Sequence, residues 1–179
     1  MAADITVKVV ISEGSKEVLS TPISYNTFAS VVSETPDSKG NQEFFAIAAK
    51  HLAQNVRENV ASKDNLDKAT VDLLSNDSSV NVLRNLVRTA GFKKYAKQDL
   101  IEKLIQQDPD IAQDIAGDRE SYEQADANKI IDLIIKLNDP YVINSIASNY
   151  STPKKILKIL MAHPDPSVAF EAKKGHDES

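Results

Sequence analysis

The 179-residue sequence contains no cysteine and no tryptophan, and it has only five glycines. The absence of cysteine excludes disulfide frameworks, catalysis by a thiolate, and zinc or iron–sulfur sites with cysteine ligands. The small number of glycines disfavours phosphate-binding loops and folds with many tight turns, because glycine is the residue that tolerates positive φ. These absences favour a mainly helical protein.

Long apolar runs and a large charge excess are absent as well. No stretch approaches the roughly 18 uninterrupted apolar residues of a transmembrane helix, and residues 1–4 do not begin a secretory signal. The composition, 41% hydrophobic and 26% charged, is typical of a soluble globular protein. The formal net charge of −5 gives the whole chain no attraction to nucleic acid or to a membrane surface. We therefore expect a cytoplasmic protein that does not bind membranes.

Residues 1–40 predict a β-hairpin appendage followed by a linker. Between Ile5 and Ile11 apolar β-branched residues occupy every second position, which is the period of a strand. The turn residues around Gly14 and the segment 16–23 then predict a second strand that ends near Pro22. Because a hairpin alone is marginal in water, we expect it to lie against the helices or to pair its free edge with another chain.

Residues 41–175 predict a helical domain, and residues 176–179 a frayed tail. Apolar residues at three- and four-residue spacing predict one uninterrupted helix from Gln42 to Ala61. Its apolar stripe comprises Phe45, Ala48, Ala49, Leu52, Val56 and Val60. Shorter helices are predicted over residues 67–75, 79–89, 98–107, 128–137 and 153–162.

An internal repeat runs through this helical domain. Four similar segments begin at Asp77, Asp108, Asp139 and Asp165, at spacings of 31, 31 and 26 residues. The positions eight and four residues before each Asp are apolar: Ala69 and Leu73, Leu100 and Leu104, Ile131 and Ile135, Leu157 and Met161. Proline follows Asp in three segments, which suits an N-cap followed by the first helical position. Each repeat is thus predicted to be a helix, a sharp break and a second helix.

The second helices are predicted to carry Leu83, Ile115, Ile146 and Ala172 inward. A helix pair of this kind buries its apolar stripe only by stacking on a neighbour, so we expect a right-handed α-α superhelix of HEAT-like repeats with a small N-terminal β-hairpin. The alternative is a closed helical bundle in which the Asp-Pro breaks are four similar caps.

The last third of the chain resembles a known repeat family. The segment Ile146-Ala147-Ser148-Asn149-Tyr150-Ser151-Thr152-Pro153 is followed by Ile156, Leu157, Leu160 and then His163-Pro164-Asp165-Pro166-Ser167-Val168. This pattern is similar to the leucine-rich repeat variant, a member of the HEAT-like α-solenoids. The match covers residues 139–175, and residues 76–118 only through apolar positions and the Asp-Pro break. The family typically places Arg after the Val, where this chain has Ala169. Some members carry a Cys-rich cluster-binding region, for which this chain has no cysteine.

No metal or cofactor site is predicted. The densest acidic run comprises Asp108, Asp110, Asp114, Asp118 and Glu120. A calcium-binding EF-hand loop starting at Asp108 would need an oxygen ligand, Gly and Glu where the chain has Ala112, Gln113 and Arg119. We interpret this run as a helix cap followed by solvated carboxylates.

Catalytic residues are not predicted either. The three histidines, at positions 51, 163 and 176, stand in no metal-binding or nucleophile motif. Ser151 and Lys154 match a Ser-x-x-Lys spacing, but without its companion motifs Ser151 or Thr152 is better explained as an N-cap before Pro153. We therefore expect a protein that is not an enzyme.

Two basic clusters are the candidate partner-binding residues. The first comprises Arg84, Arg88, Lys93, Lys94 and Lys97, and the second Lys154, Lys155 and Lys158, near Lys173 and Lys174. Such clusters hold phosphate or an acidic partner when they converge, although solvated helix faces explain them equally well.

Taken together, the sequence predicts a protein–protein interaction module, a short α-solenoid scaffold or adaptor that binds a protein partner. Homodimerisation through the hairpin edge is part of this hypothesis. The alternatives are a nucleic-acid-binding helical repeat that uses the basic clusters, and an accessory subunit of an enzyme.

Overall fold

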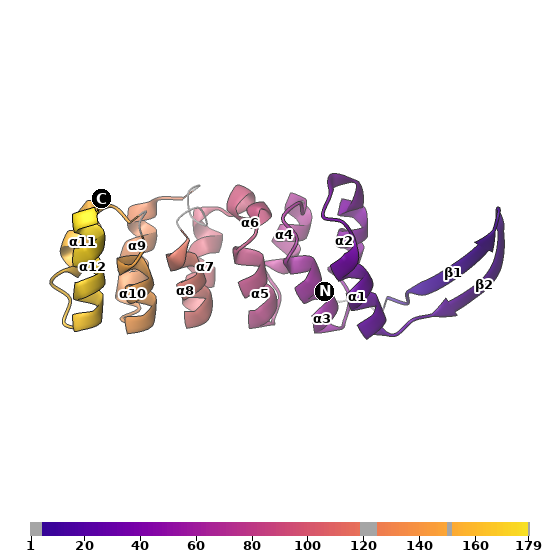
Figure 1. The fold of residues 1–179 in the computed structure, drawn as a ribbon, viewed down its shortest axis with the longest axis horizontal. Helices are drawn as coiled ribbons and strands as arrows, with labels where there is room; N and C mark the ends of the chain where they lie inside the picture. The colour runs from indigo at the N-terminus through magenta and orange to yellow at the C-terminus, as the bar shows by residue number, and fades with distance from the viewer. Residues whose placement is uncertain (1–4, 119–124, 150–151, 179) are drawn as a thin grey trace. The chain divides into compact units, whose positions relative to one another are not determined.

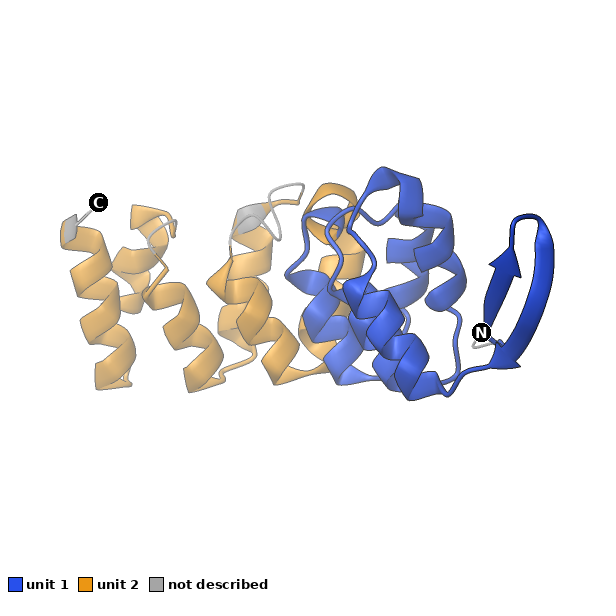
Figure 2. Ribbon diagram, turned by 45° about the vertical axis from the view of Figure 1, so that its right-hand side comes forward, with its two compact units in different colours: residues 1–91 blue, residues 92–179 orange. Residues whose placement is uncertain are grey.

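The computed structural model describes residues 5–118, 125–149 and 152–178. It divides into two compact units, residues 1–91 and 92–179 (Figure 2). The described residues contain 12 α-helices, and 63% of the chain is helical, with one two-stranded antiparallel sheet (Figure 1). The prediction of a mainly helical chain with a small N-terminal β-hairpin is therefore confirmed.

The hairpin consists of β1 (Lys8–Glu13) and β2 (Lys16–Pro22), joined by a tight turn. Gly14 adopts a φ of 61° in this turn, a conformation that glycine reaches without strain. Val9 lies opposite Thr21 and Ile11 opposite Leu19, after which the register shifts because β2 has one extra residue. Strand β2 lies within the predicted segment 16–23, whereas β1 begins three residues later than the predicted strand over residues 5–11 and extends two residues beyond it, to Glu13.

Helix α1 (Tyr25–Glu34) lies inside the segment predicted to be hairpin and linker, and the sequence pattern did not identify it. Ser24 caps the helix, because its side chain accepts a hydrogen bond from the Thr27 backbone N–H. Phe28, Ala29 and Val32 form its buried face. A short 3-10 helix (Lys39–Asn41) follows.

The predicted single helix over residues 42–61 is wrong. The structure has two helices, α2 (Gln42–Ala48) and α3 (Gln54–Ala61), separated by a break that contains His51. The Nδ1 atom of His51 accepts a hydrogen bond from the Ala53 backbone N–H at 3.0 Å, so a side chain supplies the acceptor that a helix would take from its own backbone. Leu52, a predicted core residue, is 58% exposed at this break.

The first unit is completed by α4 (Lys68–Leu74) and α5 (Val80–Val87). Helix α3 packs against α1 on one side and α5 on the other, and α2 packs against α3 and α4. The amides of Asn59 and Asn85 bridge these layers by donating hydrogen bonds to the carbonyl oxygens of Ala29 and Glu58 on the preceding helices. Helix α6 (Ala90–Tyr95) contains the boundary between the units.

The second unit contains three pairs of helices. They are α7 (Gln98–Gln107) with α8 (Pro109–Gly117), α9 (Ala127–Lys136) with α10 (Pro140–Ala147), and α11 (Lys154–Leu160) with α12 (Pro166–Glu178). Helix α10 packs against both α8 and α12, so the second helices of the three pairs lie side by side (Figures 1 and 2). Helix α12 includes residues 176–178, where the sequence predicted a frayed tail.

The Asp-Pro breaks form as predicted. The carboxylates of Asp108, Asp139 and Asp165 accept hydrogen bonds from backbone N–H groups two residues ahead, and each following proline begins a helix. Asp77 is different, because Ser79 is the N-cap of α5. At α11 the predicted cap is also wrong. Helix α11 begins at Lys154 after Pro153, and the hydroxyl of Thr152 donates to the carbonyl oxygen of Ile146. Ser151 lies outside the described residues.

The buried stripe of the first helices is partly displaced from its predicted positions. Leu104, Ile131 and Leu157 are fully buried as expected, but Ala69 is exposed and Met161 is 37% exposed. The number of residues between each first helix and its Asp also varies. Helix α7 ends directly before Asp108, whereas residues 137–138 and 161–164 intervene after α9 and α11. The inward positions of the second helices, Leu83, Ile115, Ile146 and Ala172, are all buried.

None of the helices in the described ranges combines the length and the apolar character needed to cross a membrane.

Candidate functional site

The most unusual surface is the hairpin itself. All residues of β1 and β2 are exposed, and no described helix of the same unit covers either face (Figure 1). Five of these residues are large and apolar, with exposed fractions of 44–58%: Val9, Val10, Ile11, Val18 and Leu19. Neither face of the sheet is therefore buried against the part of the chain that the structure describes, although a two-stranded sheet needs such support in water.

The apolar residues of the hairpin are not evenly shared between its faces. Ile11 and Leu19 lie directly opposite each other, so they project from the same face, and Val9 joins them because it is two residues from Ile11. Val10 projects from the other face, opposite Ser20. The first face is thus an exposed apolar surface, which we call the apolar hairpin face (Val9, Ile11 and Leu19).

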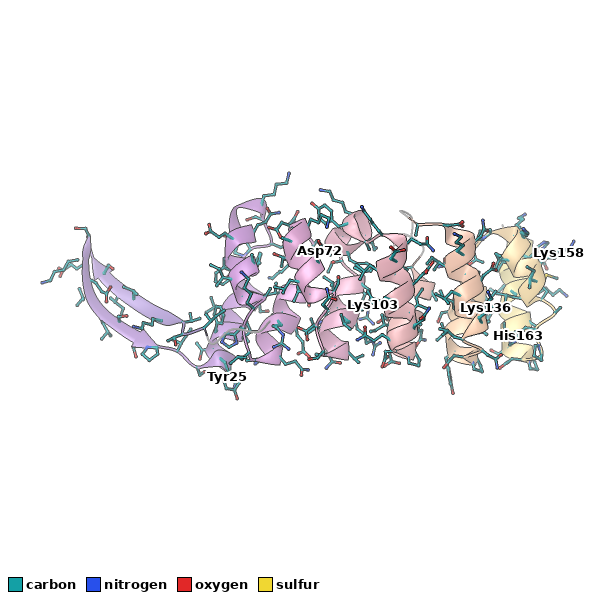
Figure 3. The ribbon with its side chains drawn as sticks, turned by 180° about the vertical axis from the view of Figure 1, so that it is seen from behind. Tyr25, Asp72, Lys103, Lys136, Lys158 and His163 are labelled. Atoms are coloured by element: carbon teal, nitrogen blue, oxygen red, sulfur yellow. The ribbon has the colours of Figure 1, made fainter. Side chains whose placement is uncertain are left out.

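A pocket of about 410 Å³ lies at the base of the hairpin. Its walls are mainly apolar, with a few polar groups: Ile5, Thr6, Val7, Ile23, Ser24, Tyr25, Phe28, His51, Leu52 and Ala53. Tyr25, at the start of α1, is 57% exposed there (Figure 3). His51 is buried with its ring 5.6 Å from that of Phe28. The volume suits one large side chain or a small ligand.

The imidazole of His51 has a structural role. Its Nδ1 atom is already occupied by the Ala53 N–H group, which places the proton of a neutral ring on Nε2. His163 repeats the arrangement, because its Nδ1 atom accepts from the Asp165 backbone N–H at 3.1 Å. Among the described residues no three His, Asp or Glu side chains lie close enough together to hold a metal ion. Glu120, from the acidic run, lies outside the described residues.

The first basic cluster is divided between the two units. Arg84 and Arg88, in the first unit, line a polar pocket of about 320 Å³ together with Glu58, Asn81 and Asn85. Both arginines take part in further interactions within the chain, so neither is a free cation. This pocket combines cations with a carboxylate and two amides, so its chemistry is mixed rather than basic.

The lysines of the first cluster belong to the second unit, and two of the three contact other side chains. Lys93 forms an ion pair with Asp118 at 2.6 Å, which offsets its charge. The Nζ atom of Lys94 lies 4.8 Å from the centre of the Tyr95 ring. Lys97 is exposed and immediately precedes α7. Arg84 and Arg88 are thus described within one unit and the three lysines within the other, and whether the five converge on one surface stays a prediction.

The second cluster is more exposed. Lys154, Lys155 and Lys158 are exposed on α11, whose buried residues are Ile156, Leu157 and Leu160. Lys173 and Lys174 on α12 are exposed as well. Figure 3 shows Lys158 on α11 and Lys136 on α9, both on the side of the second unit that faces the viewer. Ile159, next to Lys158, is 54% exposed, so this lysine-rich face also carries an apolar side chain.

Sequence reasoning missed the pocket at the base of the hairpin. Its residues come from the strand ends, α1 and the break between α2 and α3, and both α1 and the break were absent from the predicted elements. The Ser24 cap followed by Phe28, Ala29 and Val32 is a helical signal that would have identified α1. Comparison of the sequence with protein-family models, with curated proteins and with solved structures finds no match.

Proposed function

We propose that the protein is a non-enzymatic protein–protein interaction module whose N-terminal hairpin is the docking element. The observation that carries this proposal is the exposure of both strands of a two-stranded sheet with five large apolar side chains. Exposed apolar surface of this kind marks an interaction site in a protein with an otherwise buried core. A partner strand or surface would supply the support that the isolated sheet lacks.

The helices of each unit would then serve as a scaffold. Three helix pairs with similar Asp-Pro caps stand side by side in the second unit, and α1, α3 and α5 pack in succession in the first. We propose that these pairs belong to a right-handed α-α superhelix of HEAT-like repeats, in keeping with the resemblance to the leucine-rich repeat variant. In such an arrangement each helix pair buries the apolar side of its neighbour.

The alternative functions have weaker support. Nucleic-acid binding through the first basic cluster is disfavoured by the Lys93–Asp118 ion pair and by the engagement of Arg84 and Arg88. A role as an accessory subunit of an enzyme is a special case of protein binding, and the same experiment would find it. The side chains of His51 and His163 accept hydrogen bonds from backbone N–H groups, and this structural role gives no support to a catalytic function.

The test compares two double variants of the hairpin. Val9→Lys with Leu19→Lys places charges on the apolar hairpin face, and Ser12→Lys with Ser20→Lys places the same charges on the other face. We expect a protein that co-purifies with the wild type, and binds it saturably when purified, to be lost with the first variant and kept with the second. Equal binding by both variants, with unchanged helical circular dichroism, would contradict the proposal.

A further inference from the structure

We infer that the free edge of β1 pairs antiparallel with β1 of a second copy of this chain, which creates a four-stranded sheet with the order β2–β1–β1–β2. This inference rests on the proposed function, because it names the partner of the hairpin. It is carried by the register of the hairpin, by the hydrogen bond at its base and by the different chemistry of its two edges.

The hydrogen bond at the base of the hairpin fixes the direction of the β1 backbone groups. Ile23 donates its N–H to the carbonyl oxygen of Val7 at 3.0 Å, so the polar backbone of Val7 faces β2. Hydrogen-bonded and non-hydrogen-bonded pairs alternate along an antiparallel ladder. Lys8 and Val10 therefore point their N–H and C=O groups away from β2, towards the free edge. Pro22 lies opposite Lys8, where no N–H is needed.

The outer edge of β2 is a poor template for another strand. Pro22 ends it, and the extra residue at Val18 interrupts its regular pairing. The β1 edge has no proline and keeps a regular register from Lys8 to Ile11. Because only one edge is suited to pairing, association closes as a two-fold dimer and does not continue into a fibre.

The charges of the hairpin favour a second copy as the occupant. Residues 8–22 contain two lysines and two glutamates, Lys8, Lys16, Glu13 and Glu17, so the hairpin has a net charge of zero. A surface with no net charge favours neither an acidic nor a basic partner, and two copies of it do not repel each other electrostatically. A two-fold interface places the same patch on both sides, which a neutral patch with an apolar face permits.

In an antiparallel pair of β1 strands, residues that lie opposite each other must project from the same face of the sheet. A two-fold axis that passes through the Val10 pair satisfies this condition. Val10 then lies opposite Val10 of the partner subunit, and Lys8 lies opposite Ser12 of the partner subunit. Val9 lies opposite Ile11 of the partner subunit, so the apolar hairpin faces of both copies join into one surface. No like charges oppose each other in this register.

Single-cysteine variants of the full chain test this register, because the chain has no cysteine of its own. Opposed residues in an antiparallel hydrogen-bonded pair have Cα atoms about 5.5 Å apart, which is within the range of a disulfide. We expect Val10→Cys to form the disulfide dimer at least about tenfold faster than Ser20→Cys under mild oxidation. Ser20 is the matched control, since it lies opposite Val10 on the same face but on β2.

A second measurement separates the dimer from the wider proposal. Sedimentation equilibrium of the wild type should give a dimer whose dissociation constant rises at least about tenfold in Val10→Pro, because that N–H faces the free edge. A wild type that stays monomeric at about 100 μM, or equal disulfide rates for both cysteine variants, would overturn the inference. If a monomeric wild type still binds another protein through the apolar hairpin face, only the identity of the partner is wrong, and the proposed function stands.

Discussion

Arg57 and Asp77 form a two-point ion pair, with Nε 2.6 Å from Oδ2 and Nη2 3.1 Å from Oδ1. The same guanidinium donates to the carbonyl oxygens of His51 and Leu52 through Nη1. Asp77 in turn accepts from the Ser79 backbone N–H at the start of α5. One arginine of α3 thus joins the break after α2 to the turn before α5.

Removing one partner of this pair should destabilise the protein strongly. The side chains of Arg57 and Asp77 are only 12% and 7% exposed, so Asp77→Asn leaves a nearly buried guanidinium without its counter-charge. We expect a loss of roughly 3–5 kcal/mol in the free energy of unfolding, measured with urea. The control is Asp72→Asn, which breaks the exposed Lys68–Asp72 pair and should cost less than about 0.5 kcal/mol. Equal losses in the two variants would contradict the role of the buried pair.

The same pair predicts a pH dependence. Burial raises the pKa of Asp77, but the hydrogen bonds and charge of Arg57 and the backbone N–H groups of Ser78 and Ser79 outweigh it, so the pKa lies below its usual value. A carboxylate with a lowered folded-state pKa stabilises the protein above its unfolded pKa of about 3.9, and this contribution is lost as the pH falls further. The stability difference between the wild type and Asp77→Asn should therefore shrink below about pH 4. A difference that stays constant from pH 7 to pH 3 would be inconsistent with this account.

The register of the buried stripe can be tested with one residue of α11 and the residue that directly follows this helix. Leu157 is fully buried on α11, whereas Met161, which the repeat pattern also placed inward, is 37% exposed. We expect Leu157→Ala to lower the free energy of unfolding by about 2–5 kcal/mol and Met161→Ala by less than about 1 kcal/mol. The reverse order would show that the stripe follows the repeat spacing after all.

The cap of α10 should contribute measurably to stability. The carboxylate of Asp139 accepts from the backbone N–H groups of Tyr141 and Val142 at 2.9 and 3.1 Å. Asp139→Ala should cost about 1 kcal/mol in thermal or urea unfolding. Asp132→Ala, at an exposed position of α9, removes the same charge without a cap and serves as the control. The cap assignment fails if the two substitutions have the same effect.

The nucleic-acid alternative predicts the opposite of our proposal in a binding assay. We expect no binding of short duplex DNA or single-stranded RNA at about 150 mM salt, as measured by fluorescence anisotropy. Binding that weakens steeply with salt and with Lys158→Glu would support the alternative, because phosphate contacts release counterions. Lys93→Glu is a weaker probe, since Lys93 is already paired with Asp118.

Much of the fold was predictable because local rules decide it. The alternation around Val9 and the turn at Gly14 predict the hairpin, and α7 has the bounds that its apolar period gives. The Asp-Pro caps at Asp108 and Asp139 are local as well, since Asp and Pro satisfy the first turn of a helix by themselves.

The errors have more than one cause. Helix α1 was missed although its Ser24 cap is a local signal, whereas the break within residues 42–61 also involves a residue distant in the sequence. Nothing in the composition of residues 42–61 indicates a break in the helix. At the break, the Ala53 N–H donates a hydrogen bond to the His51 side chain. Arg57, which is paired with Asp77, donates to the backbone carbonyl of His51. The proximity of Arg84 and Lys93 in the sequence likewise does not predict the interactions that each side chain makes in the structure, such as the ion pair between Lys93 and Asp118. The two strands predicted a hairpin that lies against the helices or pairs with another chain, but the exposure of both strands required the structure.

The most direct test of an occupied hairpin is residue-specific photo-cross-linking in living cells. A photoreactive amino acid at Val9 should give covalent protein adducts, whether with a second copy or with another protein. Val9 lies on the apolar hairpin face, and in the proposed dimer it lies opposite Ile11 of the partner subunit. The same group at Asp132, exposed on α9, provides the background. We predict several-fold more adduct at position 9 than at position 132. Adduct formation at position 9 that does not exceed this background would contradict the account.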